Sequence, residues 1–458
     1  MRTKIITSIG PASKSHDILR EFYRLGVRCM RINFAHGDAR FWGEIVSAIR
    51  DLEALVKDYI CLIGDLPGPS IRLGDFGELP FKRGSKIVFS NAGDGVPVRD
   101  MEFYELVDEG DIILLDDGRV VLEVVSSSWG RVETIALTDG ILRSGKGLAI
   151  RGKEISSQIL RERDLEALRF SVENSFSYIG ASHVRSPEDL RIVRKTIQSL
   201  GGKQKILAKI ENMSAVKNIE TIAEEADGIV IARGDLGMNI GLEEIPAIQR
   251  RIINICREMG KPCIVATQIL ESMMNSPVPT RAEVGDLYGV IAQGVDGIML
   301  TGETAVGMYP IEAVKWAKRV IERAEKDPEI IYGGTEQKKI VPSIGRRGRL
   351  PYGIYRLSES MQAPIAIIDI DLRDAIPISV NKPKHKIYFI TNNIDPYRQA
   401  HLLWGVEPIY TKDLSESTNI IQYIKEKILK EASEAHTYDK LLLINNTSNK
   451  KSIEIIEL

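Results

Sequence analysis

The sequence predicts an α/β protein: a (β/α)8 TIM barrel, a small all-β domain inserted into it, and a Rossmann-like α/β domain at the C-terminal end. Two observations carry this prediction. Eight short apolar runs, rich in β-branched residues, alternate with longer amphipathic stretches. This alternation is typical of parallel strands joined by crossover helices, and eight such units predict a closed barrel. More than a hundred residues separate the third run from the fourth, which predicts an inserted domain rather than a loop.

The eight runs also indicate where the chemistry should lie. Active sites of such barrels are built at the C-terminal ends of the strands. The polar residues that close each run are therefore the candidates for function. In chain order the runs are 4–9, 27–34, 60–66, 177–183, 205–211, 228–233, 262–268 and 297–302.

The insertion is expected to be a lid made of hairpins. Strand-like runs occur at 86–89, 112–125 and 131–137, and the residues Asp116-Asp117-Gly118 are a tight-turn signal inside the second run. We expect the first barrel segment at 1–67, the lid at 68–153 and the second barrel segment at 154–332.

The C-terminal domain is expected at 333–458. A charged, Gly-rich linker at 333–349 leads into a new alternation of strands and helices. The strands are predicted at 365–370, 386–391, 408–411 and 441–444, with a helix at 418–432.

Composition excludes several classes of protein. The 458 residues contain 61 Lys and Arg against 63 Asp and Glu, a net charge of −2 that argues against a nucleic-acid-binding protein. No stretch of 18 or more apolar residues predicts a membrane span. The four cysteines have no short paired spacing, so we expect free thiols in a reducing, cytoplasmic compartment.

A metal site is predicted where the fifth and sixth runs end. Residues two apart on a strand share a face, so Lys209 and Glu211 should project together into the barrel mouth. Asp235 follows a Gly turn that should open a short helix, whose free N–H groups attract anions. Two carboxylates with room for water suit Mg²⁺. The alternative interpretation is a surface Lys–Glu pair and an ordinary turn aspartate.

Other strand ends supply an anion site and supporting groups. Arg31 and Asn33 share one face, and a buried arginine needs an anion, which is either a substrate or a structural carboxylate. Asp65 closes the third run, and Arg72 lies just beyond the stiff Pro67-Gly68-Pro69 exit. Thr267 closes the seventh run, where a hydroxyl could relay a proton. His36 alone is weak evidence for any role.

One phosphate-binding motif is incomplete. Residues 140–146 fit Gly-x-x-x-x-Gly-Lys, but Gly147 stands where a P-loop needs Ser or Thr. The segment also lies in the β-rich insertion, not between a strand and a helix. We reject a P-loop, although Lys146 could still contact a nucleotide phosphate from the lid.

Together these strand ends resemble the pyruvate kinases. The matching segments include Met-Arg-Ile-Asn-Phe-Ala-His-Gly at 30–37, Ile-Leu-Ala-Lys-Ile-Glu at 206–211 and Ala-Arg-Gly-Asp-Leu-Gly at 232–237. The other matches, in order, are 3–13, 65–72, 144–148, 181–185, 266–273, 279–283 and 299–305.

The resemblance implies transfer of a phosphoryl group from phosphoenolpyruvate to ADP, followed by protonation of enolpyruvate. It implies a cytoplasmic homotetramer that uses Mg²⁺ or Mn²⁺ and binds neither nucleic acid nor membrane. The implied residues are, for the divalent metal, Glu211 and Asp235; for the substrate, Arg31, Lys209, Gly234, Asp235 and Thr267; and for the nucleotide, Asn33, His36, Arg72 and Lys146. Lys209, Thr267 and Arg31 are the implied catalytic residues.

The chain departs from the family pattern at a monovalent-cation site. Asn33, Asp65 and Leu66 occupy that site, but Ala35 and Leu66 stand where most of the family has Ser and Thr. Ser70 also replaces a Glu. With a hydroxyl and a charge missing, we expect weak or absent K⁺ binding and activity that does not require K⁺. His183 replaces a Phe and has no explanation from the sequence.

The C-terminal domain departs as well. Asp369, Asp371 and Asp374 lie where the family often has a loop that binds a sugar phosphate. Their charges would repel phosphate, so we expect no control by fructose bisphosphate.

Two other functions fit part of the pattern. A barrel lyase or aldolase using Mg²⁺ would explain Glu211 and Asp235 but would leave Lys209, Lys146 and the lid without a role. A catalytically inactive ligand sensor would have little reason to keep the implied catalytic residues. Pyruvate formation with and without ADP discriminates among the three.

Overall fold

Eight parallel strands close into a barrel at the centre of the molecule, as predicted. The computed structural model describes residues 1–98, 100–116, 118–154, 158–327, 349–414, 421–427, 438–446 and 451–458. Around the barrel the strand order is β1-β16-β15-β14-β13-β12-β3-β2, with every neighbouring pair parallel. The strands are β1 (Lys4–Ser8), β2 (Cys29–Asn33), β3 (Cys61–Asp65), β12 (Tyr178–Ala181), β13 (Lys205–Ile210), β14 (Gly228–Ala232), β15 (Cys263–Ala266) and β16 (Gly297–Leu300).

The alternation of side chains along each strand separates the inside of the barrel from its helical coat. On β13, Ile206, Ala208 and Ile210 pack into the cluster shared with the helices, whereas Leu207 belongs to the cluster inside the barrel. Lys209 continues the inward-facing row toward the C-terminal end. The row therefore changes from apolar to charged where the barrel opens.

Amphipathic helices cover the barrel, and their start signals are local. Thr280 caps α10, since its hydroxyl accepts from the Glu283 N–H at 3.2 Å while Glu283 accepts from the Thr280 N–H at 2.8 Å. The helices are α1 (His16–Arg24), α2 (Ala39–Val56), α4 (Glu162–Glu173), α5 (Pro187–Ser199), α6 (Met213–Lys217), α7 (Ile219–Glu225), α8 (Arg233–Ile240), α9 (Ile245–Met259), α10 (Arg281–Ala292), α11 (Gly302–Ala305) and α12 (Pro310–Ala324), with 3-10 turns η1 (Leu242–Glu244) and η2 (Glu271–Met274).

The insertion between β3 and β12 is an all-β unit with its own core around Phe89 and Phe103. Its main sheet has the order β4-β11-β7-β8-β9-β6, and β10 pairs with β5. Leu115 pairs with Val120 across the predicted turn, of which Asp117 lies outside the described residues. The elements are β4 (Ile71–Arg72), β5 (Glu78–Phe81), β6 (Lys86–Ser90), α3 (Met101–Leu106), β7 (Ile112–Leu115), β8 (Val120–Ser128), β9 (Arg131–Ala136), β10 (Gly140–Arg143) and β11 (Gly147–Ile150).

The C-terminal part is an α/β sheet with the order β19-β18-β17-β20-β21. The four predicted strands are present and parallel, and an unpredicted fifth, β21, pairs antiparallel with β20. The predicted helix at 418–432 is helical over 421–427, and its remaining residues, like linker residues 333–348, lie outside the described ranges. The elements are α15 (Arg349–Met361), β17 (Ile365–Ile368), α16 (Ala375–Ser379), β18 (Ile387–Thr391), α17 (Ile394–Ala400), β19 (Val406–Tyr410), β20 (Lys440–Asn445) and β21 (Ser452–Glu457).

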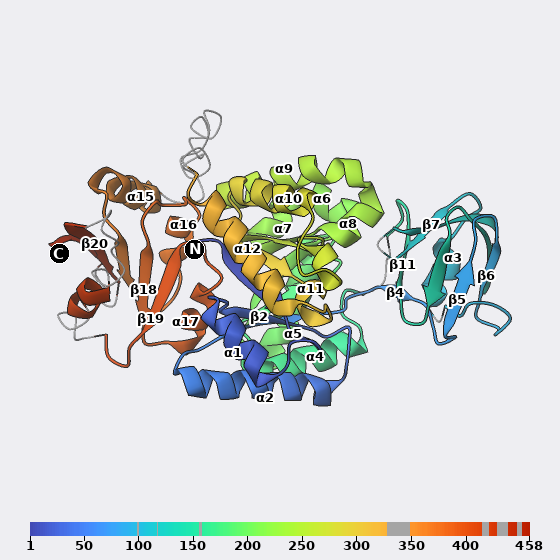
Figure 1. Ribbon diagram of the computed structural model, residues 1–458, viewed down its shortest axis with the longest axis horizontal. Coiled ribbons are helices and arrows are strands. Elements are labelled where there is room, and N and C mark those ends of the chain that lie inside the picture. Colours follow the sequence, from blue (N-terminus) through green and yellow to red (C-terminus); the bar gives the residue numbers. More distant parts are fainter. Residues whose placement is uncertain are drawn as a thin grey trace.

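The two smaller units lie at opposite ends of the barrel (Figure 1). The all-β unit faces the end with α8, and the C-terminal sheet faces the end where the chain begins. Leu402 of the C-terminal unit joins the apolar cluster inside the barrel and closes its N-terminal end. The other end is left open for a site.

Two further properties concern the whole described chain. All four cysteines are buried and free. Among the described residues, no helix has the length and apolar character needed to cross a bilayer.

Candidate active site

A cavity of about 870 Å³ opens at the C-terminal ends of the barrel strands, between the barrel and the root of the lid. Its walls contain every residue that the sequence singled out for catalysis, substrate, nucleotide or metal: Arg31, Asn33, His36, Asp65, Leu66, Arg72, Lys146, Lys209, Glu211, Gly234, Asp235 and Thr267. Residues up to 236 positions apart in the chain, Arg31 and Thr267, are brought together because most of these residues lie near the C-terminal ends of the barrel strands.

Lys209 and Glu211 form the buried centre of the cavity. The Lys209 ammonium lies 2.9 Å from Glu211 Oε1 and 3.2 Å from Asp65 Oδ1, and it donates to Ser182 Oγ at 2.7 Å. Burial opposes the charge of Lys209, but the carboxylates of Asp65 and Glu211 outweigh burial and raise its pKa. Burial likewise opposes the charge of Glu211, and the Lys209 ammonium lowers the pKa of that carboxyl. Both groups are therefore ionised at neutral pH.

Arg31 is held by the protein itself in this structure. Its Nε donates to Asp65 Oδ2 at 2.8 Å, its Nη2 donates to the same oxygen, and its Nη1 donates to Ser8 Oγ at 2.9 Å. The sequence left open whether the anion opposite Arg31 is a structural carboxylate, and Asp65 is such a partner. Two of the five guanidinium N–H groups remain beyond these three bonds, and the side chain lines the cavity.

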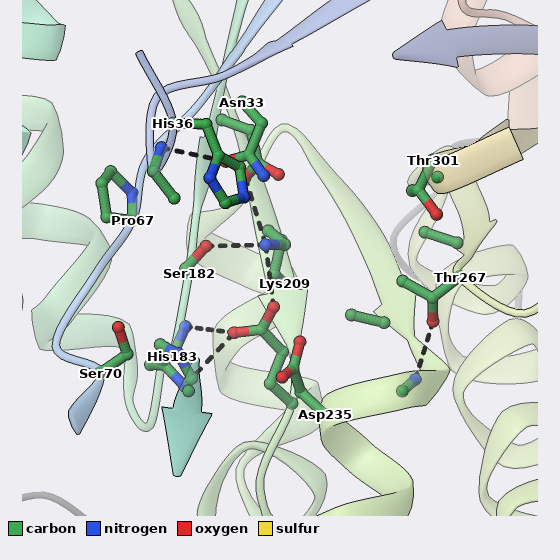
Figure 2. A pocket seen from close by; sticks show the side chains of 18 of the residues that line it. Asn33, His36, Pro67, Ser70, Ser182, His183, Lys209, Asp235, Thr267 and Thr301 are labelled. Atoms are coloured by element: carbon green, nitrogen blue, oxygen red, sulfur yellow. Dashed lines mark hydrogen bonds and ion pairs between the residues drawn. The ribbon is translucent and has the colours of Figure 1, made fainter. Parts of the chain in front are cut away.

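The start of α8 supplies main-chain donors, as the sequence predicted. Helix α8 begins at Arg233, so the N–H groups of Gly234 and Asp235 lie in its first turn, where main-chain donors point out of the helix end. The Gly234 N–H donates to Thr267 Oγ1 at 2.7 Å. Figure 2 shows Thr267 across the pocket from His183, with Lys209 and Asp235 between them. Thr267 and the start of α8 thus line the same cavity as the charged cluster, with the hydroxyl directed at the Gly234 amide.

Three residues of this cavity have a strained backbone. His183, Thr267 and Gln268 adopt left-handed backbone conformations, with φ of 55°, 66° and 50°. For residues with a Cβ this conformation is costly and persists only where the surroundings demand it. Because all three residues line the cavity, the strain places their side chains and amides at the strand ends.

The lid side of the cavity is basic. Arg72 ends β4 and donates to the Gly145 carbonyl at 3.0 Å, and Lys146 immediately precedes β11, the strand that pairs with β4, so the two cations lie close together. The Lys146 ammonium lies 3.1 Å from Asp116 Oδ1. Burial and then the charge of Arg72 lower the pKa of His36, which keeps that imidazole neutral at pH 7. A polyanion would be attracted to this wall.

Three contributors to the site were missed by the sequence analysis. Ser182 binds Lys209, His183 contacts Glu211, and Glu271 forms an ion pair with Arg119 of the lid. Ser182 and His183 close the fourth run and follow β12 directly, so position at a strand end was the available signal. Glu271 carries no such signal, since its partner is 152 positions away.

The donor set fits a divalent ion. Glu211 Oε1 is buried and makes no hydrogen bond of acceptable geometry, although the Lys209 ammonium lies close to it. Asp235 lines the same cavity. Among the described residues no group of three or more His, Cys, Asp or Glu side chains forms a complete cage. Mg²⁺ is usually bound by one or two protein carboxylates, and water and substrate oxygens complete its coordination shell.

Comparison with known proteins identifies the family. A family model described as "Pyruvate kinase, barrel domain" matches residues 1–314. This chain belongs to the pyruvate kinase family. A pyruvate kinase of Aeropyrum pernix is 36% identical over 446 residues, which cover 96% of this chain and 92% of that protein. A pyruvate kinase of Clostridium acetobutylicum is 32% identical over 480 residues and all of both chains.

The solved structures agree with this assignment. The crystal structure of pyruvate kinase from Pyrobaculum aerophilum superposes with a TM-score of 0.83 at 30% identity and covers 99% of each chain. The barrel, the inserted all-β unit and the C-terminal α/β sheet are thus the fold of a known enzyme family. The chain is an enzyme, a kinase of the transferase class.

Proposed function

We propose that this pyruvate kinase family member transfers the phosphoryl group of phosphoenolpyruvate to ADP in this cavity, yielding pyruvate and ATP in glycolysis. The observation that carries the proposal is the buried Lys209 ammonium, 2.9 Å from Glu211 and beside Arg31 at the barrel mouth. Phosphoryl transfer needs positioning and charge stabilisation more than covalent chemistry, and this cluster provides both.

Glu211 and Asp235 are the residues that would hold Mg²⁺ or Mn²⁺. The ion would supply positive charge for the oxygens of the transferring phosphoryl group. Lys209 neutralises the charge that develops on the phosphoryl group and on the enolate oxygen. Since Asp65 and Glu211 keep the lysine protonated, its charge is in place before the substrate arrives.

Arg31 grips the phosphate of the substrate with its remaining N–H groups, while Asp65 holds the guanidinium in place. The amides of Gly234 and Asp235 bind the substrate carboxylate at the start of α8. The Thr267 hydroxyl, which accepts from the Gly234 N–H, would pass a proton to the methylene carbon of enolpyruvate.

The basic lid wall is the nucleotide side of the proposed site. Arg72 and Lys146 contact the phosphates, and His36 and Asn33 line the same approach. Because the pKa of His36 is lowered, its neutral ring offers a hydrogen bond rather than a charge. The all-β unit would close over the nucleotide and exclude water during transfer.

Pyruvate formation from phosphoenolpyruvate, measured with and without ADP, tests the proposal. We expect turnover only with ADP and a divalent metal, and equal amounts of pyruvate and ATP. Turnover without ADP would instead support a lyase, and ligand binding without turnover would support a sensor.

We also propose that this activity does not require K⁺. The Asn33 side-chain oxygen accepts from the Ala35 N–H at 3.1 Å, and the two Asp65 oxygens face Arg31 and Lys209. Ala35 and Leu66 offer no side-chain oxygen, so few ligands remain for a monovalent cation. Initial rates in tetramethylammonium buffer with and without 100 mM KCl, about physiological ionic strength, should agree within about twofold. A requirement for K⁺ would refute this.

The proposal also covers the domain boundaries, the cellular location and assembly of the enzyme, and its regulation. The boundaries 1–67, 68–153, 154–332 and 333–458 would delimit the barrel segments, the lid and the C-terminal domain. The enzyme would act in the cytoplasm as a homotetramer, and light scattering of the purified chain tests the assembly.

Asp374 already pairs with Lys451, and Asp369 accepts from Asn446 at 3.1 Å, so a sugar bisphosphate should not activate the enzyme.

A further inference from the structure

His183 occupies a position that the proposed chemistry does not use. It follows β12 at the mouth of the cavity, and its side chain is 26% exposed. The ring Nδ1 lies 3.4 Å from Oε2 of Glu211, and the main-chain N–H of the same residue donates to that oxygen at 2.7 Å. His183 thus approaches Oε2 of Glu211 with both its main-chain N–H and its ring nitrogen.

The two oxygens of Glu211 are consequently in different environments. Oε2 faces the amide and the ring of His183. Among the described residues Oε1 makes no hydrogen bond of acceptable geometry, and the Lys209 ammonium lies 2.9 Å from it. A carboxylate held by one oxygen cannot rotate freely, so it presents the other oxygen in a defined direction.

The ring is confined from behind by the hinge of the lid. A Cβ placed on Gly68 would lie 3.2 Å from Cδ2 of His183 and 2.9 Å from Cβ of Ser182. Gly68 itself has φ of 67°, which suits glycine. Because residue 68 is a glycine, the hinge can pass close to the imidazole of His183. The left-handed backbone of His183 sets the direction in which its side chain leaves the main chain.

We propose that His183 is a positioning residue for Glu211: through Nδ1 it orients the carboxylate so that Oε1 is the oxygen offered to the divalent ion. This inference rests on the proposed function, because it assumes that Glu211 binds the metal. Hydrogen-bonded partners of metal ligands commonly contribute 10- to 100-fold to metal affinity. The imidazole would not itself be a ligand.

Two variants of His183 distinguish the effect of its ring nitrogen from the effect of the ring's bulk. His183→Phe keeps a ring but removes both nitrogens. His183→Asn shortens the side chain but keeps an amide N–H near the place of Nδ1, and Asn tolerates the left-handed backbone well. The main-chain N–H of residue 183 is present in both, so any difference reports the side chain.

The test is Mn²⁺ affinity of the chelator-stripped full-length chain without substrates, measured from the free-Mn²⁺ electron paramagnetic resonance signal. We expect His183→Phe to weaken binding about tenfold and His183→Asn to stay within about threefold of the original chain. Mg²⁺, measured by competition, should weaken by the same factor as Mn²⁺. The melting temperature of the metal-free protein should be unchanged in both variants.

Each other result has a definite meaning. Unchanged affinity in His183→Phe, or an equal loss in both variants, would overturn the positioning role. A loss much larger for Co²⁺ than for Mg²⁺ would mean that the ring is a ligand, because nitrogen donors favour the later transition metals. Glu211→Gln is the control for the site: if it binds Mn²⁺ as well as the original chain does, the proposed metal site itself is wrong.

Discussion

The two walls of the cavity hold their charges in different ways. On the barrel wall, the side chains of Arg31, Asp65 and Lys209 are 10%, 5% and 15% exposed. On the lid side, the side chain of Lys146, which lines the cavity, is 48% exposed, and that of Arg119, which pairs with the lining residue Glu271, is 63% exposed. Buried ions with several partners keep one geometry, whereas exposed pairs are worth about 0 to 1 kcal/mol and exchange readily with water.

This difference matches two tasks. Stabilising a transition state requires charges that need no rearrangement at the moment of reaction. A lid must instead open and close, so its contacts to the barrel should be weak. The barrel wall should therefore determine the rate of chemistry, and the lid wall should determine nucleotide affinity. The predictions below test that division.

Loss of the central charge should have the largest effect. Lys209→Met should lower kcat by about 10²-fold or more, because it removes a group that acts on the transition state, while Mn²⁺ binding is retained. Steady-state kinetics and Mn²⁺ titration measure the two effects. Lys205→Met is the matched control, since Lys205 lies on the same strand but pairs with Asp227 at the opposite end. A rise in KM alone would contradict the assigned role.

Loss of a lid charge should act on nucleotide binding. Lys146→Ala should raise the KM for ADP about tenfold, because it removes one charge-assisted hydrogen bond to a phosphate. The KM for phosphoenolpyruvate should be unchanged. Lys82, an 83% exposed lysine of the same unit that pairs with Asp139, provides the control variant Lys82→Ala. Equal changes in both KM values would mean that the walls do not divide their tasks.

The contact between the walls should have the smallest effect. Arg119 follows the lid turn and pairs with Glu271 on the barrel side. Arg119→Glu or Glu271→Arg should each raise the KM for ADP about two- to fivefold, since an exposed pair contributes up to about 1 kcal/mol.

Combining the two reversals supplies the control for this pair. The double variant should recover most of the loss, and 0.5 M salt should reduce the difference between single variants and original chain, because salt screens exposed charges. Failure of the double variant to recover would show that the two side chains do not interact in solution.

Much of the barrel wall could be predicted from the sequence because it depends on local rules. The period of two on a strand placed Lys209 and Glu211 on one face. The short helix predicted near Asp235 is present, but it starts at Arg233 directly after β14, so Gly234 lies inside α8 and not in a turn before it. The fold class followed from counting strand runs. Strand β21 was missed because its sequence mixes charged and apolar residues and most of it is exposed at the edge of the sheet.

What the sequence determined by itself is therefore which residues end the strands and which way they face, since both depend on neighbours a few positions away. The partners were decided by the tertiary structure. That Arg31 is held by Asp65, that His183 contacts Glu211, and that Arg119 reaches Glu271 depend on closing the barrel and docking the lid. Such contacts join positions that are distant in the chain, and no local pattern encodes the distance between them.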